Sequence, residues 1–590
     1  MHKGIGVSPG IVVGVAHRVE SVLGSLEQQS LANPSEIPAE IERFDQAVAE
    51  SAAELDSFVQ KVAQELGSSA AEIFRGHAQM VNDPSLQSKV HALIEDQHLT
   101  ALSALQVVMH DYAAVFARLQ PDLFRERMTD IRDVILRIES HLVRKVVTPI
   151  EEAAGATRNG GESVILVAHE ILPSQAMSLG DLPIAGIVTE LGGSTSHAAI
   201  LARSRGIPAV SGVEGIMSEV QSGDMMIVDG RDGMVLVRPD QEAMSAYRKV
   251  QREFFNLKDR LIANRDLPAK SADGAHVELL ANINNLADAH AAQKVGAAGV
   301  GLFRTEYLFL THHDVPDEEE QYEFYRQILL NSPNQTVTIR TLDLGGDKTV
   351  PYLGRRGEPN PFMGWRSTRI FLENSKLFVT QVRAILRAGR HGKVAMLFPM
   401  ITTLEELLFV NNLVKETRGN LRREGVAFGD DVKTGVMVEV PAAAVCIDAI
   451  LRETDFISIG SNDLIQYLVA ADRDNPKVAQ LCEPLSPAIF RVLRNVFDAC
   501  QRTGTPVTLC GEMAGQPRPV LVLFGLGLRR FSMSPGFIPT IKALLSSVTT
   551  AQAERFAHHV LQLNTSEEIR SYLTARMHEI SSSLEMFDTP

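Results

Sequence analysis

The chain has few cysteines, a single tryptophan and no long hydrophobic run. Its four cysteines show none of the paired spacings of metal sites, which favours a reducing cytoplasm over an oxidising compartment. No apolar run approaches the roughly 20 residues that span a bilayer. The N-terminus also lacks the continuous apolar core of a signal peptide. We therefore expect a cytoplasmic protein without membrane insertion.

Basic residues are also in short supply, because 57 Lys and Arg stand against 72 Asp and Glu and give a net charge of −15. Nucleic-acid phosphates require a basic face, so we expect no nucleic-acid partner. An apolar fraction of 45% is ordinary for a globular protein. A chain of 590 residues exceeds a single ordinary core and predicts several domains.

The hydrophobic pattern changes twice in the first half of the chain. Residues 1–20 read as extended, apolar residues recur at helical spacing from about 36 to 147, and strand-like runs return after 148. We therefore expect residues 1–20 and 148–238 to form one α/β domain, with a helical bundle at 21–147 inserted into it. The charged, amphipathic stretch 239–262 predicts a linker helix.

Residues 263–590 alternate between apolar, β-branched runs and helical segments. The strand-like runs fall at 277–284, 299–306, 336–345, 394–401, 433–440, 456–463, 506–513 and 529–535. This pattern favours a (β/α)₈ TIM-type barrel over an open doubly wound sheet. The predicted fold class is therefore multidomain α/β, with an active site at the C-terminal ends of the barrel strands.

Arginines gather where the predicted barrel strands end. Arg304 and Arg340 close two of these strands, and Arg366 and Arg473 lie in loops just beyond others. Because arginine binds carboxylate and phosphate groups bidentately, we expect a small ligand that carries both. Asn462 can hold one of its oxygens as a neutral donor.

Two carboxylates, Glu439 and Asp463, follow neighbouring predicted strands. Together with ligand oxygens and waters they form a set that suits Mg²⁺. The alternative is that each carboxylate only pairs with an arginine. Four arginines at the same rim favour the metal.

Cys510 also lies at a predicted strand end, near these arginines. An isolated cysteine is most often a small buried hydrophobic residue. Its position instead suggests a proton donor or a nucleophile.

A second candidate centre lies far away in the sequence, at residues 192–203 (GGSTSHAAILAR). The paired glycines allow a tight turn, and the Ser and Thr residues can cap the helix that follows. His197 would then lie at a helix N-terminus, where backbone N–H groups and the helix dipole favour a phosphate. A neutral imidazole nitrogen there is free to act as a nucleophile.

The segment 192–203, with SRGIPAV after it, resembles the phosphohistidine signature of the phosphoenolpyruvate-utilising enzymes. The segment DFISIGSNDLIQYLVAADR (455–473) resembles the second signature of that family. GLFRTEYLF, IRTLDLGGDK, NPFMGWRSTRI, GVMVEVPAA and LCGEMAG are similar to its other barrel segments. The resemblance covers almost the whole chain, in the family's order.

Within that family the N-terminal half resembles the Enzyme I branch, since only about 150 mostly helical residues precede the phosphohistidine segment. This resemblance implies an inserted bundle that docks the phosphocarrier protein HPr, with His77, Arg127 and Arg132 as candidate contacts. It also implies a homodimer through the barrel. Position 194 is Ser where many Enzyme I sequences have Arg, and the second signature has Gly-Ser-Asn-Asp where Gly-Thr-Asn-Asp is common. Neither difference removes a reacting group.

The resemblance implies a mechanism in two stages. Phosphoenolpyruvate binds to Arg304, Arg340, Arg366, Asn462 and Arg473, with Mg²⁺ (or Mn²⁺ in its place) at Glu439 and Asp463. His197 takes the phosphoryl group through Nε2, Cys510 protonates the enolate to give pyruvate, and HPr then receives the phosphoryl group. One histidine serving two distant centres implies a large domain rotation about the linker helix. This is the first step of sugar uptake by the bacterial phosphotransferase system.

Two other functions remain open on the sequence. The first is an ATP- or pyruvate-linked enzyme of the same family, which ATP binding would support. The second is a catalytically silent regulatory protein that keeps the fold and binds partners. Binding of phosphoenolpyruvate without turnover would favour the regulatory protein.

Overall fold

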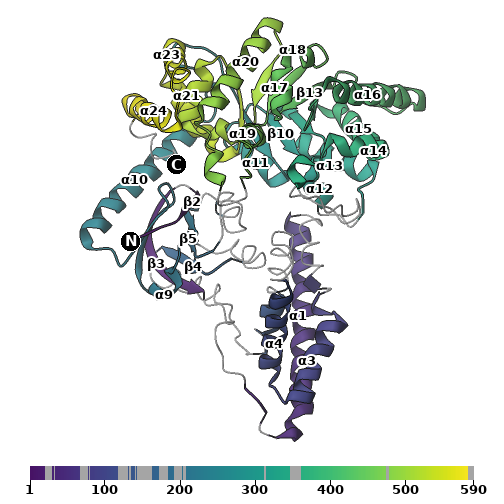
Figure 1. Ribbon diagram of the computed structural model, residues 1–590, viewed down its shortest axis with the longest axis vertical. Helices are drawn as coiled ribbons and strands as arrows, with labels where there is room; N and C mark the ends of the chain where they lie inside the picture. The colour runs from purple at the N-terminus through teal and green to yellow at the C-terminus, as the bar shows by residue number, and fades with distance from the viewer. Residues whose placement is uncertain are drawn as a thin grey trace. The chain divides into compact units, whose positions relative to one another are not determined.

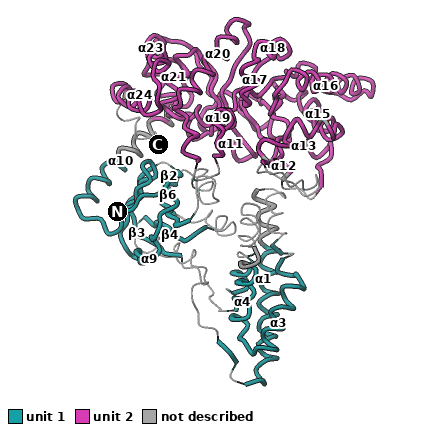
Figure 2. Tube along the Cα trace, in the orientation of Figure 1, with its two compact units in different colours: residues 1–255, 589–590 teal, residues 256–588 magenta. Residues whose placement is uncertain are grey.

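The computed structural model describes residues 1–8, 10–19, 29–31, 33–66, 77–78, 80–116, 131, 134–139, 141–142, 163–171, 184–191, 202, 207–310, 314–345, 360–473 and 478–581. The chain divides into two compact units near residue 255 (Figure 2). Each unit has hydrophobic clusters of its own, and the second contains the largest one. Among the described residues, no helix has both the length and the apolar character required to cross a membrane.

The first unit contains one mixed β-sheet. Its strands are β1 (His2–Lys3), β2 (Ile5–Ser8), β3 (Ile11–Val19), β4 (Val164–Ala168), β5 (Ile184–Thr189), β6 (Ala209–Ser211), β7 (Met225–Asp229) and β8 (Met234–Val237). They are arranged in the order β1-β8-β7-β3-β4-β5-β6-β2. Because β3 pairs in parallel with β4, the start of the chain joins strands that follow the helical segment.

The same unit contains the helices α1 (Ile37–Leu66), α3 (Pro84–Gln97) and α4 (Ala101–Phe116). Asp83 begins α3 by accepting a hydrogen bond from the Ser85 N–H, and Pro84 supplies the fixed φ of a first helical residue. The helices bury apolar side chains that recur at helical spacing, among them Phe44, Leu55 and Val90. These contacts make a core that is separate from the core of the sheet.

The long helix α10 (Gln241–Ala263) follows the sheet. It overlaps the predicted linker at 239–262, and the sheet draws its strands from both predicted parts of the α/β domain. The exact domain boundaries stay predictions.

The second unit contains a closed barrel of eight strands. They are β9 (Glu278–Ile283), β10 (Val300–Arg304), β11 (Thr336–Arg340), β12 (Lys393–Phe398), β13 (Lys433–Val438), β14 (Phe456–Ile459), β15 (Val507–Leu509) and β16 (Arg530–Met533). Neighbouring strands pair in parallel throughout, and β16 closes the circle by pairing with β9. The predicted barrel is therefore confirmed, and the open sheet was the wrong alternative.

Helices surround this barrel (Figure 1). In chain order they are α11 (Leu286–Lys294), α12 (Glu306–Leu310), α13 (Glu318–Leu330), α14 (Thr368–Glu373), α15 (Ser375–Ala388), α16 (Leu404–Glu424), α17 (Pro441–Val445), α18 (Ile447–Ile450), α19 (Ser461–Val469), α20 (Pro487–Thr503), α21 (Pro517–Gly525), α22 (Ile538–Ser546), α23 (Thr550–Val560) and α24 (Ser566–Ser581). Local sequence sets several of their ends: Thr403 and Glu406 form a capping box at the start of α16, and Gly425 ends it at φ 70°.

The strands end earlier than the sequence pattern predicts. The run 336–345 yields a strand only to Arg340, and the run 456–463 yields β14 to Ile459 with α19 beginning at Ser461. Because chain direction changes so soon after each strand, the polar residues of these runs lie on turns and first helical turns at the barrel rim. This arrangement brings side chains from several strands together.

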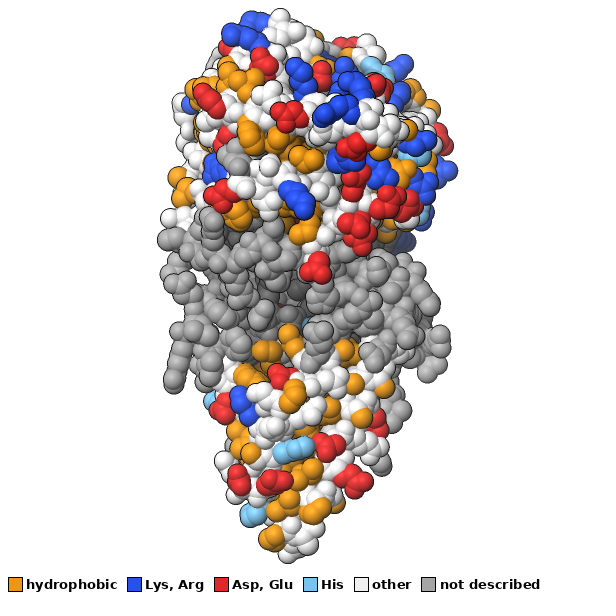
Figure 3. Space-filling model, turned by 90° about the vertical axis from the view of Figure 1, so that its right-hand side faces the viewer, with side chains coloured by type: hydrophobic (Ala, Val, Ile, Leu, Met, Phe, Trp, Pro, Cys, Tyr) orange, Lys and Arg blue, Asp and Glu red, His pale blue; other side chains and the backbone are white. Residues whose placement is uncertain are grey.

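Basic and acidic side chains are intermixed on the described face of the barrel seen in Figure 3. Arg383 and Arg387 of α15, for example, form ion pairs with Glu318 of α13, and Arg383 also pairs with Glu424 of α16. Such exposed pairs each contribute about 0–1 kcal/mol. They account for charged helix faces without requiring a ligand there.

Candidate active site

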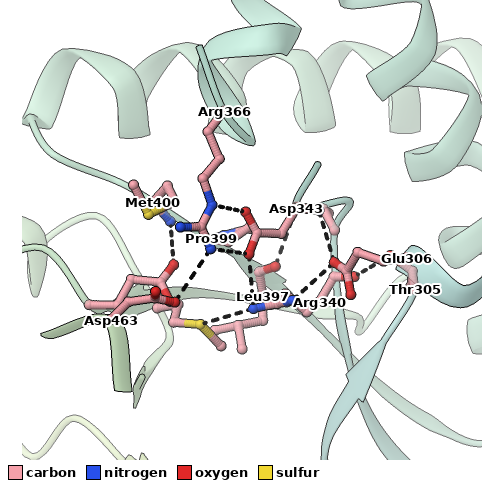
Figure 4. A network of polar contacts seen from close by, with 12 residues as sticks. Thr305, Glu306, Arg340, Asp343, Arg366, Leu397, Pro399, Met400 and Asp463 are labelled. Atoms are coloured by element: carbon pink, nitrogen blue, oxygen red, sulfur yellow. Dashed lines mark hydrogen bonds and ion pairs between the residues drawn. The ribbon is translucent and has the colours of Figure 1, made fainter. Parts of the chain in front are cut away.

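A chain of buried ion pairs connects the ends of several barrel strands (Figure 4). Arg340, the last residue of β11, lies 3.0 Å from Glu306 and 3.2 Å from Asp343. Asp343 also accepts two hydrogen bonds from Arg366, at 3.0 and 2.9 Å. Arg366 in turn lies 3.4 Å from Asp463 of α19. The structure thus brings together residues that are far apart in the sequence.

Asp343 is the centre of this network. Its carboxylate is 1% exposed and lies between two guanidinium groups, one of which binds it bidentately. Burial works against the charge of Arg366, but the carboxylates of Asp343 and Asp463 outweigh it and raise the pKa of Arg366. Both arginines therefore stay charged, and they present fixed cations to an anionic ligand.

Tyr467 of α19 also forms a hydrogen bond with Arg366. Its hydroxyl accepts a hydrogen bond from Arg366 Nη1 at 3.2 Å and donates one to the Phe362 carbonyl at 2.5 Å. Burial raises the pKa of Tyr467 to about 12, so the phenol keeps its proton. This contact ties the segment before α14 to α19.

Glu439, directly after β13, is buried beside the network. Its Oε1 accepts a hydrogen bond from the Met400 N–H at 2.7 Å, and Met400 adopts φ 56°. A positive φ at a non-glycine residue costs about 1–3 kcal/mol, so the surrounding contacts must hold Met400 in this conformation. Burial, and then the carboxylates of Asp463 and Asp343, raise the pKa of Glu439 to about 8.

The chemistry of these carboxylates fits a divalent cation. Among the described residues, no cluster of three or more His, Cys, Asp or Glu side chains is placed to hold a metal. Glu439 and Asp463 could supply two ligands to such a cation, and a bound anion or water would supply the others, as is usual for Mg²⁺. A bound cation would lower this raised pKa of Glu439, because it stabilises the ionised carboxylate.

Gly460 lies close to the Glu439 carboxylate and leaves room for it. A Cβ atom on Gly460 would lie 2.7 Å from Glu439 Oε2, so position 460 admits only glycine while the carboxylate keeps its place. Asp463 Oδ1 is buried and accepts no hydrogen bond within the described part of the chain, although Arg473 Nη1 approaches it to 3.4 Å. Within the described part of the chain, Asp463 Oδ1 and Glu306 Oε2 are buried carboxylate oxygens of this site that lack a hydrogen bond.

Cys510 follows β15 and is 2% exposed. It packs with Leu302, Leu397 and Met437, which come from three other strands. Burial raises the pKa of its thiol to about 11, and the thiol donates to the Ile459 carbonyl at 3.4 Å. Cys510 is therefore a protonated thiol at the end of the barrel that carries the arginines.

The remaining predicted rim residues also lie at this end. Asn462 Oδ1 accepts a hydrogen bond from the Glu512 N–H at 3.0 Å, which joins the turns after β14 and β15. Arg304 ends β10 and is close enough to lower the pKa of Cys510, against the larger effect of burial. The charge of Arg304 also lowers the pKa of Asp288, against the larger effect of burial.

The second predicted centre is only partly visible. His197, Arg127 and Arg132 lie outside the described residues. His77 is described and is 2% exposed, so its imidazole offers little surface to a partner, and its docking role stays a prediction. His169 Nδ1 lies 2.6 Å from Oε2 of Glu190, a residue that precedes the predicted His197 segment in the sequence.

Sequence reasoning missed several residues that hold this site. Glu306 ends the predicted run 299–306 and Asp343 lies in the run 336–345, but no role was predicted for either. Tyr467 lies inside the segment 455–473, and its place on the same face of a short helix as Asp463 was the available signal. The Met400 N–H had no signal in the sequence.

Three family models match the chain. The model for the PEP-binding domain of PEP-utilising enzymes covers residues 258–550. The models for their N-terminal and mobile domains cover residues 3–127 and 160–233. The first of these matches contains the whole ion-pair network.

Curated relatives match over nearly their full length. A phosphoenolpyruvate-protein phosphotransferase of Bacillus sp. (strain S) is 39% identical over 97% of this chain and 97% of its own. The protein of the same name from Bacillus subtilis (strain 168) is 38% identical over 97% and 98%. An NMR solution structure of Enzyme I (nEIt) protein is 32% identical over 43% of this chain and 99% of that chain, with a TM-score of 0.34. On the sequence relatives, the chain belongs to the family of phosphoenolpyruvate-utilising enzymes.

Proposed function

We propose that this chain is a phosphoenolpyruvate-protein phosphotransferase of the Enzyme I type. The observation that carries the proposal is the buried network of Arg340, Asp343, Arg366 and Asp463 beside a protonated Cys510. The relatives of that name support the substrate. As a phosphotransferase, the chain would catalyse the first step of phosphotransferase-system sugar uptake.

The arginines bind the substrate. Arg304, Arg340, Arg366 and Arg473 hold the carboxylate and phosphate of phosphoenolpyruvate, and Asn462 assists as a neutral group. Planar guanidinium groups suit both anions and fix the orientation of the reacting phosphorus. Phosphoryl transfer depends mainly on such positioning and on neutralising charge.

Glu439 and Asp463 would hold Mg²⁺, which supplies charge neutralisation to the transferring phosphoryl group. The family is generally dependent on this metal, and Mn²⁺ is the proposed substitute. The protein's own contribution is to keep both carboxylates buried and oriented, through the Met400 N–H and the space left at Gly460.

His197 is the proposed nucleophile. Its Nε2 forms a bond to phosphorus while the bond from phosphorus to the enol oxygen breaks, which leaves the enolate of pyruvate. The Cys510 thiol gives its proton to C3 of this enolate, so pyruvate and a thiolate result. The thiolate then regains a proton from water.

The phosphoryl group then passes from His197 to a histidine of HPr. The proposed domains serve this scheme: 1–20 with 148–238 carry His197, 21–147 dock HPr, 239–262 are the linker, and 263–590 bind phosphoenolpyruvate. His77, Arg127 and Arg132 are the proposed HPr contacts. The homodimer and the cytoplasmic location stay predictions.

The proposal is tested by label transfer from phosphoenolpyruvate to the wild-type chain and to His197→Ala, with and without Mg²⁺ and HPr. Acid-labile label on the wild type alone, which then moves to HPr, is the expected result. Label retained by folded His197→Ala would refute the nucleophile. Binding of phosphoenolpyruvate to folded wild type without any label would favour a regulatory protein instead.

A further inference from the structure

Gln381 lies on α15, in the ring of helices outside the barrel, yet its side chain is 1% exposed and reaches the strand ends. Its Oε1 accepts the Leu342 N–H at 2.9 Å. Its Nε2 donates to the Thr305 hydroxyl at 3.2 Å and to the Tyr325 hydroxyl at 3.1 Å. Both the carbonyl and the NH₂ group of this buried amide are hydrogen-bonded. Such a fully bonded buried network rigidifies the groups that it joins.

The three contacts fix the orientation of the amide. The Thr305 hydroxyl already donates to the Arg340 carbonyl at 2.9 Å, and the Tyr325 hydroxyl donates to Gln321 Oε1 at 3.2 Å. Both hydroxyls can therefore only accept from Gln381, while the Leu342 N–H can only donate to it. The other amide orientation would place oxygen against two hydroxyl oxygens and NH₂ against an N–H group.

The groups held by Gln381 are interleaved with the proposed binding residues. Thr305 stands between Arg304 and Glu306, and Leu342 precedes Asp343. The Thr305 hydroxyl also reaches the backbone of Arg340. The Gln381 side chain thus fixes the backbone just after β10 and β11. Arg304 and Arg340, two of the proposed substrate-binding residues, end these strands. Glu306 and Asp343, the carboxylate partners of Arg340, follow them.

The hydrogen bonds of Gln381 continue into α13, away from the strand ends. Tyr325 is fully buried on α13, and Gln321 on the same helix donates to the Pro316 carbonyl at 2.8 Å. Burial raises the pKa of Tyr325 beyond its usual range, so its hydroxyl stays neutral and keeps both hydrogen bonds. The Tyr325 hydroxyl that accepts from the Gln381 amide is therefore itself fixed by further buried hydrogen bonds through Gln321.

We propose that Gln381 is a positioning residue for the phosphoenolpyruvate half-reaction, which sets the places of Arg304, Glu306, Arg340 and Asp343 through Thr305 and Leu342. The inference rests on the proposed function. It assigns Gln381 no contact with the substrate. Its effect on the reaction is indirect, because displacing a binding group by about 1 Å can cost a hundredfold in rate.

Three variants of the full chain test this role. Gln381→Met keeps the length of the side chain, adds no charge and removes all three hydrogen bonds. Tyr325→Phe removes one of them and is the milder change. Thr417→Val is the matched control, because the Thr417 hydroxyl is buried in the same helical layer but bonds only to Leu413 of its own helix.

Two rates are compared for each variant. The first is transfer of label from phosphoenolpyruvate to the chain, with its kcat and KM. The second is exchange of the phosphoryl group between chemically phosphorylated HPr and the chain, which does not use the barrel rim. Thermal unfolding of each variant gives its folded fraction.

We expect Gln381→Met to lower kcat/KM for phosphoenolpyruvate by about tenfold or more, mostly through KM, while HPr exchange stays within about twofold of wild type. Tyr325→Phe should fall between Gln381→Met and wild type, and Thr417→Val should match wild type in both rates. A purely structural role would slow both rates alike, and that result would overturn the inference. So would an unchanged kcat/KM in folded Gln381→Met. If wild type itself forms no phosphoenzyme, the proposed function fails first.

Discussion

Cys510 should remain a protonated thiol far above neutral pH, and this can be measured directly. Burial raises its pKa to about 11. At pH 8 the thiolate fraction is then about one in a thousand, whereas an unperturbed thiol of pKa about 8.5 is about one quarter thiolate. Because only the thiolate is nucleophilic, alkylation of Cys510 should be at least about 200-fold slower than alkylation of a simple thiol.

The assay is limited carbamidomethylation of the native chain, followed by quantification of each cysteine by mass spectrometry. Cys446 is exposed and provides the internal reference in the same sample. Between about pH 7 and pH 10 the Cys510 rate should rise about tenfold per pH unit without a plateau, because its thiolate fraction grows in that proportion. A plateau below about pH 9, or labelling as fast as that of Cys446, would refute the reasoning.

The same protonation state determines what Cys510 can do in the reaction. A group that holds its proton to about pH 11 stays loaded as a donor, so it should cause no loss of pyruvate production across the neutral range. Cys510→Ala should slow pyruvate production far more than exchange with HPr. Equal slowing of both would exclude Cys510 as the acid.

Three further outcomes follow from the rim. The pKa of Glu439 is raised to about 8, and Mg²⁺ binds the ionised carboxylate. The apparent dissociation constant of Mg²⁺, measured by calorimetry, should therefore rise about tenfold for each pH unit below 8. A flat profile would remove Glu439 from the metal site. Gly460→Ala places a methyl 2.7 Å from Glu439 Oε2 and should lower kcat/KM for phosphoenolpyruvate by about tenfold or more. Gly419→Ala, with nothing within 4 Å, is its control, and equal effects would show that the space at Gly460 is not needed. Arg366→Met removes one of the two arginines that contact each of the buried carboxylates Asp343 and Asp463. It should cost about 3–5 kcal/mol in urea unfolding of the barrel, and a loss below about 1 kcal/mol would mean that these charges are hydrated.

The barrel was predictable because its strands are buried on both faces and so read as apolar runs between helical segments. Strand ends were less predictable, since the same apolar run continues into the turn. Leu342 and Leu344, for example, are buried but lie beyond β11. Hydrophobicity reports burial, whereas a strand ends where its ladder of hydrogen bonds stops.

The side chains at the rim were predictable by type. Arginines and carboxylates at the ends of parallel strands have few structural reasons to be there, so the sequence singled out Arg340, Glu439 and Asp463. The structure places them at the barrel rim, and their roles stay predictions. Residues that act through a backbone group or from another layer were not. Gln381 lies on an outer helix, 39 residues from Leu342 and 76 from Thr305, and no local pattern marks it.

The charges of the rim nearly cancel before any ligand arrives. Its four arginines, Arg304, Arg340, Arg366 and Arg473, stand against four carboxylates, Glu306, Asp343, Glu439 and Asp463. An anion added alone would have to compete with these carboxylates for the arginines, and a cation added alone would compete with the arginines for the carboxylates. An anion and a cation that bind together keep the balance, so each should strengthen the binding of the other by the same factor. The carboxylates at the rim contribute to the raised pKa of Glu439 and to that of Arg366. This set of paired charges favours a metal-bound phosphate over a metal ion alone or a phosphate alone.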